Sequence, residues 1–327
     1  MWRTALSVSA ALAYLAFTTP SRADNAPLLV LEAKIPLGPV SGRIDHMAID
    51  LARQRLFVAE LGNDSLGVVD LAAGKLLQTV TGLNEPQGVG YEKSSDTIYV
   101  ANARDGSVRL LAGATLSPAG RLDLGSDADN IRIDAGGEVV IGHSDGTLTV
   151  IEAASRKRLT DIALAAHPEG FQLGSRQIFV NTPDARAIAV IDRATQKQTG
   201  TWHVPNARSN FPMALDRDGS RVLVVFRSPP LLVTLDAADG RVISRVPVCG
   251  DADDLFADVK RQLIYVSCGE GVIDIFTADD TTVRRGRVAT ASGARTSLLV
   301  PELDRLYLAV RASGGEPAAI WVLRPLP

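Results

Sequence analysis

The sequence lacks several short motifs that would indicate a particular chemistry. It has no H-E-x-x-H and no C-x-x-C pair, which are typical of zinc sites, and "GVGYEK" lies in a predicted strand and opens no helix that could hold a phosphate. Basic residues are not in excess, since 34 lysines and arginines stand against 37 acidic residues. Proteins that bind nucleic acid usually present a basic surface. We therefore expect no nucleic-acid partner.

Long apolar runs are also scarce, and the one that exists lies at the start of the chain. It covers residues 5–17, follows Arg3, and precedes Ser21 and Ala23 at the −3 and −1 positions of a small-residue cleavage site. A permanent membrane anchor needs roughly 20 apolar residues, so this run is too short to be one. The pattern predicts a signal peptide over residues 1–23, removed by a cut after Ala23.

The predicted mature chain, residues 24–327, contains no second long apolar run. Loss of two arginines with the signal peptide would leave 32 basic and 37 acidic residues, a formal charge of −5. We expect a soluble periplasmic or secreted protein with no integral membrane segment, and a monomer.

What the chain does contain is a repeat. A core of three apolar residues occurs seven times, and the intervals between the middle residues are 42, 41, 39, 45, 41 and 42. A period near 40 with strand-type composition is typical of a β-propeller, in which each repeat forms one four-stranded blade. The seven cores are Leu56-Phe57-Val58, Ile98-Tyr99-Val100, Val139-Val140-Ile141, Ile178-Phe179-Val180, Leu223-Val224-Val225, Ile264-Tyr265-Val266 and Leu306-Tyr307-Leu308.

The last repeat supplies only three predicted strands, "SLLVPEL", "RLYLAV" and "AAIWVL". A fourth is available near the start of the mature chain, in "PLLVLEAKIPL" (residues 27–37), and its addition would leave no open sheet edge. The sequence therefore predicts an all-β fold: one seven-bladed β-propeller domain over residues 24–327, with four-stranded blades and a ring closed by the N-terminal strand.

Three segments carry a resemblance to a known family. "TIYVANARDGSVRLL" (97–111), "RLFVAELGNDSLGVVDL" (55–71) and "QIFVNTPDARAIAVID" (177–192) resemble the YVTN-repeat β-propeller family of exported bacterial proteins. The resemblance covers essentially the whole mature chain and implies the same fold, but the family's known roles are scattered and imply no single function. Repeats such as "VVIGHSDG" lack the asparagine of the motif. In two other repeats Asn102 and Asn181 lie at or near its position.

Polar residues gather at one predicted face of the propeller, where the loops entering the first strands and the loops between second and third strands would meet. Each residue alone suits ordinary loop solvation or turn capping. Together, around the mouth of a channel, they favour a site for a small polar or anionic ligand or for an exported partner protein. The candidate ligand-binding residues are Arg43, Asp45, Gln87, Asn102, Arg104, His143, Asn181, Arg208, Asn210, Arg227, Asp253, Arg295 and Arg311.

The alternative is a metal-dependent enzyme at the same face. His46, Asn130, Glu169 and Asp254 come from four blades and could supply ligands to one divalent cation such as calcium. The set is similar to that of lactonase-type propellers, and this likeness implies a hydrolase or lyase. His46 or His167 would then be the general base, and Arg43 or Arg295 would hold a substrate carboxylate. No other cofactor is implied.

The two cysteines map to the same face of the sixth repeat. In an oxidising compartment, Cys249 and Cys268 would form a disulfide that holds the loop carrying Asp251, Asp253 and Asp254. Two buried free thiols are the alternative.

Overall fold

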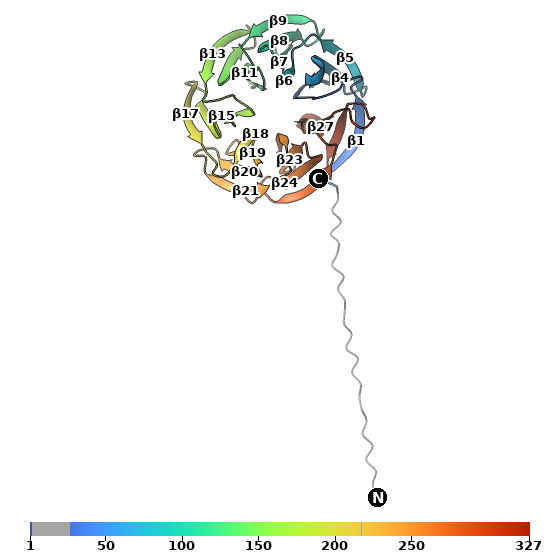
Figure 1. Cartoon of the computed structure of the whole chain (residues 1–327), viewed down its shortest axis with the longest axis vertical. Coiled ribbons are helices and arrows are strands. Elements are labelled where there is room, and N and C mark those ends of the chain that lie inside the picture. The colour runs from blue at the N-terminus through green and yellow to red at the C-terminus, as the bar shows by residue number, and fades with distance from the viewer. Residues whose placement is uncertain (2–26, 217) are drawn as a thin grey trace.

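A computed structural model describes Met1, residues 27–216 and residues 218–327. The predicted signal peptide and its cleavage site therefore lie outside the described residues, apart from Met1. The described chain consists of β-strands joined by turns and loops, and its helical elements are two short 3-10 turns, η1 (Leu61–Asn63) and η2 (Pro301–Leu303). Seven four-stranded antiparallel sheets stand around a ring, so the predicted all-β, seven-bladed propeller is confirmed (Figure 1).

The first three blades follow the chain without interruption. Blade 1 contains β2 (Met47–Asp50), β3 (Arg55–Glu60), β4 (Ser65–Asp70) and β5 (Lys75–Thr81). Blade 2 contains β6 (Pro86–Glu92), β7 (Thr97–Asn102), β8 (Ser107–Ala112) and β9 (Pro118–Asp123). Blade 3 contains β10 (Ile131–Ile133), β11 (Glu138–His143), β12 (Thr147–Glu152) and β13 (Lys157–Ala163).

The next three blades repeat this order. Blade 4 contains β14 (Phe171–Leu173), β15 (Gln177–Thr182), β16 (Ala187–Asp192) and β17 (Lys197–Trp202). Blade 5 contains β18 (Arg208–Leu215), β19 (Arg221–Ser228), β20 (Pro230–Asp236) and β21 (Val242–Pro247). Blade 6 contains β22 (Ala252–Asp258), β23 (Leu263–Cys268), β24 (Val272–Thr277) and β25 (Arg284–Ala289).

Blade 7 joins the two ends of the described chain. Its strands β26 (Ser297–Val300), β27 (Arg305–Val310) and β28 (Ala319–Pro325) come from the C-terminal end, and its outer strand is β1 (Leu29–Pro36). β1 pairs antiparallel with β28 from Leu29 opposite Pro325 to Pro36 opposite Ala319. This pairing gives β28 a partner on both sides, so β28 is not an open sheet edge.

The apolar triplets lie in the second strand of each blade, and their side chains alternate between the two neighbouring blades. In blade 1, Phe57 packs in a cluster with blade 2, whereas Leu56 and Val58 pack in a cluster with blade 7. Successive side chains of a strand point to opposite faces, so a strand covered on both faces is apolar at every position. Seven such clusters, one between each pair of neighbouring blades, form the core.

Blade 5 departs from the predicted alignment by one residue. In the other six blades the middle residue of the triplet faces the following blade, but Val224 packs against blade 4, while Leu223 and Val225 pack against blade 6. The reason lies in the sequence, because residues 222–226 are apolar throughout and specify no register by themselves.

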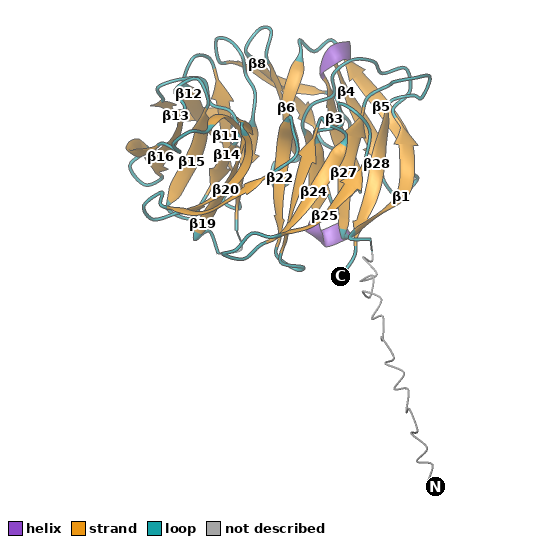
Figure 2. Ribbon diagram, turned by 60° about the horizontal axis from the view of Figure 1, so that its bottom comes forward, coloured by secondary structure: helices purple, strands orange, loops and turns teal. Residues whose placement is uncertain are grey.

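The two predicted loop sets do meet at one face of the ring. The amide of Gly62, between β3 and β4, donates to the carbonyl of Arg43, in the loop before β2, at 2.9 Å. In blade 2, the amide of Arg104 donates to the carbonyl of Asn84 at 3.3 Å. Figure 2 shows the strands running between this face and the opposite one. The first strands of the blades line a central channel, whose mouth these loops surround.

Candidate functional site

The channel and its mouth form two connected spaces. The mouth cavity has a volume of about 270 Å³ and the channel about 600 Å³. His46, Glu169, Phe211 and Asp253 line both, so the mouth leads directly into the channel. The residues that line the mouth cavity are Arg43, Asp45, His46, Gln87, Asp127, Asp129, His167, Glu169, Phe211, Arg227, Asp253 and Arg295.

One part of the mouth contains a group of ion pairs, which we call the arginine arc. It is contributed by blades 5, 6 and 7 and by the loop that leads into blade 1. Arg43 pairs with Asp45 at 2.7 Å, and Arg295 pairs with Asp253 at 3.0 Å. The members of the arginine arc are Arg43, Asp45, Arg227, Asp251, Asp253 and Arg295.

Arg227 is the most extensively held member of the arginine arc. Its guanidinium pairs with Asp253, its Nε donates to the carbonyl of Ala252 at 2.7 Å, and its Cζ lies 3.9 Å from the ring centroid of Phe211. Stacking of this kind adds a cation–π attraction to the ion pair. The arc therefore pairs each of its carboxylates with an arginine, while Arg43 Nε, Asp45 Oδ2 and Arg295 Nε have no hydrogen-bond partner within the described part of the chain.

The loop that carries Asp251 and Asp253 is fixed at its start by the disulfide between Cys249 and Cys268, so that sequence prediction is confirmed. Both cysteines are buried, and the amide of Cys249 donates to the Asp274 carboxylate at 2.9 Å. The bond ties the loop before β22 to the end of β23. It holds the aspartates of the arginine arc in place.

The opposite part of the mouth is different, and we call it the acidic arc: Asp127, Asp129, Asn130, His167 and Glu169, from the loops leading into blades 3 and 4. Among the described residues, no arginine or lysine forms an ion pair with Asp129 or Glu169. The one ion pair of this arc joins His167 Nδ1 to Asp127 at 3.7 Å.

Asp129 and Asn130 are buried side by side at the centre of the acidic arc, with exposures of 6% and 3%. Asn130 Nδ2 donates to Asp129 Oδ2 at 3.3 Å, while Asp129 Oδ1 and Asn130 Oδ1 have no hydrogen-bond partner. Gly88 of β6 lets that strand lie against the backbone of Asp129, because a Cβ at Gly88 would lie 1.9 Å from the carbonyl oxygen of Asp129.

Burial and like charge act together on the carboxyls of the acidic arc. Burial, reinforced by the nearby Glu169, raises the pKa of Asp129 to about 7. Burial, reinforced by Asp253, also raises the pKa of Glu169 to about 7. Both carboxyls therefore exchange protons near neutral pH, which is unusual for these residue types.

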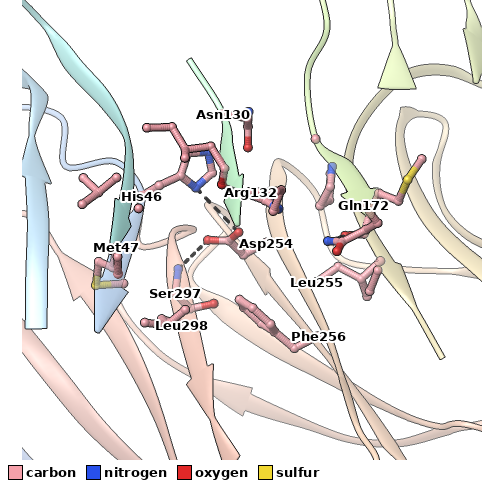
Figure 3. A pocket seen from close by; sticks show the side chains of 18 of the residues that line it. His46, Met47, Asn130, Arg132, Gln172, Asp254, Leu255, Phe256, Ser297 and Leu298 are labelled. Carbon is pink, nitrogen blue, oxygen red and sulfur yellow. Dashed lines mark hydrogen bonds and ion pairs between the residues drawn. The ribbon is translucent and has the colours of Figure 1, made fainter. Parts of the chain in front are cut away.

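His46 lies below the mouth, where Figure 3 shows it beside Asp254. His46 Nδ1 is 3.9 Å from Asp254 Oδ1, and its Nε2 is 3.8 Å from Asp45. Asp254 also accepts a hydrogen bond from the amide of Ser297 at 2.6 Å (Figure 3). Burial, together with Asp253, raises the pKa of Asp254 well above its ordinary value.

The channel below is lined by polar and apolar side chains in mixture. Arg132 and Gln172 line it (Figure 3), and Gln172 is held by a hydrogen bond to the carbonyl of Met213 at 2.7 Å. Burial lowers the pKa of Arg132. Apolar residues that line the channel include Ile131, Ile133, Leu173, Met213, Leu215, Leu255 and Phe256.

Of the predicted ligand-binding residues, three asparagines lie within the frame of the propeller. Asn102 Nδ2 donates to the carbonyls of Val100 and Ser107. Asn210 Nδ2 donates to Asn181 Oδ1 at 2.8 Å, which links blades 4 and 5. None of the three lines the mouth cavity or the channel as described.

The remaining predicted residues lie around the mouth without lining it. His143 is buried, with Nε2 2.8 Å from Thr149 Oγ1, and Arg104 is exposed and pairs with Asp64 and Glu85. Arg208 is exposed, and Arg311 is half-buried near the arginine arc. Burial, with Arg295 and Arg43 nearby, lowers the pKa of Arg311.

The predicted metal ligands share the channel but do not form a compact site. His46, Asn130, Glu169 and Asp254 all line it. Within residues 27–216 and 218–327, no group of three or more His, Cys, Asp and Glu side chains is placed to hold one ion. The metal site therefore stays a prediction, and we derive no step through a metal.

Sequence reasoning missed Phe211, Arg132 and Gln172 because it searched the loops, whereas these residues lie on first strands.

The sequence also contains a G-x-S-x-G pattern at residues 142–146 that the sequence analysis missed. Such a pattern needs a strand–turn–helix context to present a nucleophile. Here the pattern forms the hairpin between β11 and β12, and Ser144 Oγ lies 2.9 Å from His143 Nδ1 of the same turn. The match carries no catalytic assignment.

Comparison with known proteins establishes the fold alone. No protein-family model and no curated protein matches the chain. It is similar to a chain of the Kuenenia stuttgartiensis hydrazine synthase, with a TM-score of 0.74 and 17% identity over 84% of this chain and 93% of that one. It is also similar to a chain of a mitotic checkpoint complex, with a TM-score of 0.75 and 12% identity over 99% of both chains. None of the helices in the described ranges is long and apolar enough to cross a membrane.

Proposed function

We propose that this protein is a binding module that holds a small polar ligand at the mouth of its propeller channel. The observation that carries the proposal is the mouth cavity of about 270 Å³, lined almost entirely by charged and polar side chains and leading into a channel of about 600 Å³. Concave sites with convergent polar groups are where small ligands bind. The rigid frame of seven blades would supply the preorganisation that binding requires.

The state of the charged groups favours some ligands over others. The arginines of the mouth are already paired with Asp45, Asp251 and Asp253, so an anion would have to compete with carboxylates for them. The carboxyls Asp129 and Glu169 have no such partner among the described residues. A ligand that carries a positive charge therefore fits the mouth better than an anion.

The proposed function is tested by blocking the mouth. Thermal shift and calorimetry with a panel of polar metabolites should find at least one compound that binds the wild-type protein. Gln87→Trp, which fills the mouth cavity, should then lower the affinity at least tenfold, about 1.4 kcal/mol. Gln78→Trp is the matched control, because the same change falls on the exposed outer strand β5 and should leave affinity unchanged.

A panel from which nothing binds, or equal binding by both tryptophan variants, would overturn the proposal. If the natural ligand is instead an exported partner protein that docks on this face, the two tryptophan variants would bind it equally only if its contacts avoided Gln87. Pull-down with the Gln87→Trp variant separates that case.

Two finer assignments accompany the proposal. The repeats support membership of the YVTN-type propellers, and the disulfide is compatible with an exported protein. The metal-dependent hydrolase or lyase stays a prediction, and elemental analysis of the purified protein together with lactone hydrolysis assays would test it.

A further inference from the structure

We propose that the ligand is an organic amine whose ammonium group binds at the acidic arc, between Asp129, Asn130 and Glu169. This inference rests on the proposed function and names the chemical class of its ligand. It begins from the hydrogen-bonding capacity that the acidic arc leaves unused.

The open groups of the acidic arc are acceptors. Asp129 Oδ1 and the amide oxygen Asn130 Oδ1 are both buried and both without a partner, while Asn130 Nδ2 is occupied by Asp129 Oδ2. A buried acceptor without a donor destabilises the protein, because it has lost its hydrogen bonds to water. Figure 3 shows Asn130 among the side chains that line the channel, close to His46. A bound group that supplies donors would recover this cost.

The charge of the site specifies a cation. Asp129 and Glu169 line the mouth cavity together, and Asp127 lies in the same loop as Asp129. Burial raises the pKa of both carboxyls, with Glu169 adding to the effect on Asp129 and Asp253 to the effect on Glu169. The nearby His46 and His167 at Asp129, and Arg227 at Glu169, offset only part of this rise. A positive charge placed between them would offset that penalty.

An ammonium group suits this geometry better than a metal ion. An ammonium carries three donors that can reach acceptors in different directions, so it needs no common coordination sphere. A metal ion does need one, and the described residues place no three His, Cys, Asp or Glu side chains in such a sphere. The amide oxygen of Asn130 is an equally good acceptor for an ammonium.

The channel offers space for the rest of the ligand. Ile131 and Ile133 follow Asn130 directly along β10 and line the channel. Leu173, on the neighbouring strand β14, also lines it. An alkyl or aryl group attached to the ammonium would lie against these side chains and bury apolar surface, about 25 cal/mol per Å². The fitting ligand is therefore an amine with an apolar tail.

Calorimetry and thermal shift at pH 8 test the inference with hexylamine, hexanol, hexanoate and calcium chloride as probes. Hexylamine should bind and raise the melting temperature, while hexanol and hexanoate, which share its tail, should bind at least tenfold more weakly. Asp129→Asn should weaken hexylamine binding at least tenfold. Asp145→Asn removes the same charge from the same blade at an exposed position outside the mouth, and should leave affinity within twofold.

Each other outcome overturns the amine assignment. Tighter binding of hexanoate would place an anion at the arginine arc, and a shift with calcium alone would make the acidic arc a metal site. Equal binding of hexanol and hexylamine would mean that only the apolar tail contributes to binding. If no probe binds but the metabolite panel finds a ligand that Gln87→Trp excludes, this inference fails and the proposed function stands.

Discussion

Both arcs of the channel mouth contain carboxyl groups, and they differ in whether these groups are paired with arginines. In the arginine arc, Asp253 is contacted by both Arg227 and Arg295. In the acidic arc, Asp129 and Glu169 have each other as neighbours and no arginine or lysine partner among the described residues. The carboxylates of one arc are therefore paired with arginines, whereas Asp129 and Glu169 of the other arc lack such a partner among the described residues.

The difference separates residues that hold the structure from residues that can bind. A paired, hydrogen-bonded charge gains little from a ligand, because the ligand must first break an existing interaction. An unpaired buried carboxyl gains the most, because its desolvation is uncompensated in the free protein. This contrast predicts opposite effects of substitution in the two arcs.

The largest effect is expected where the arginine arc is anchored. Replacement of Cys249 and Cys268 by alanine together opens a loop with a sequence separation of 19, and should lower the free energy of unfolding by about 3 kcal/mol. Urea denaturation of the variant and of the oxidised wild type measures the difference.

Binding data on the same variant sharpen the comparison. The loop released by the substitution belongs to the arginine arc, so hexylamine affinity at the acidic arc should stay within about twofold. A loss of stability below about 1 kcal/mol would contradict the anchoring role of the disulfide. A loss of amine binding equal to that of Asp129→Asn would show that the two arcs are not independent.

A smaller loss should follow from breaking one pair of the arginine arc. Arg227→Met keeps the length of the side chain but removes the ion pair with Asp253 and the hydrogen bond to Ala252, and should cost about 2 kcal/mol. Arg208→Met is the control, an exposed arginine of the same blade, expected to change stability by less than about 0.5 kcal/mol. Thermal unfolding that ranks the two variants equally would contradict the pairing argument.

The fold could be predicted from the sequence because its cause is repeated. Each second strand is buried on both faces, so triplets such as Leu56-Phe57-Val58 have no polar position, and the period of these triplets counts the blades. The predicted alignment is wrong by one residue in blade 5. Residues 222–226 are all apolar there, so nothing in the sequence distinguishes one face of the strand from the other.

The site could be predicted only as a face. Loop positions placed Arg43, Glu169 and Asp253 at the mouth, but they also placed Asn181 and Asn210 there, and these two bond to each other within the frame. Local sequence does not show whether a polar side chain finds a backbone partner nearby or points into a channel. Nor does it show pairing, since Asp129 and Asp253 both precede or begin first strands and end in opposite electrostatic surroundings.

The smallest effect expected has the opposite sign, and it tests the acidic arc without any ligand. Asp129→Asn should raise the free energy of unfolding by about 1 kcal/mol at pH 8, because it removes a buried charge that no described arginine or lysine pairs. In the wild type the pKa of Asp129 rises from 3.8 to about 7 on folding. The unfolded chain therefore loses its proton first, and stability falls as pH rises from about 4 to about 7.

The gain from Asp129→Asn should follow the same window: small near pH 4, growing to pH 7 and constant above it. Urea titrations at pH 5 and pH 8 measure it, with Asp145→Asn as the exposed control that shows no such growth. A variant less stable than wild type at pH 8 would mean that Asp129 is held by a partner after all. The acidic arc would then be as complete as the arginine arc, and the contrast between a paired and an unpaired half of the mouth would no longer explain where a ligand binds.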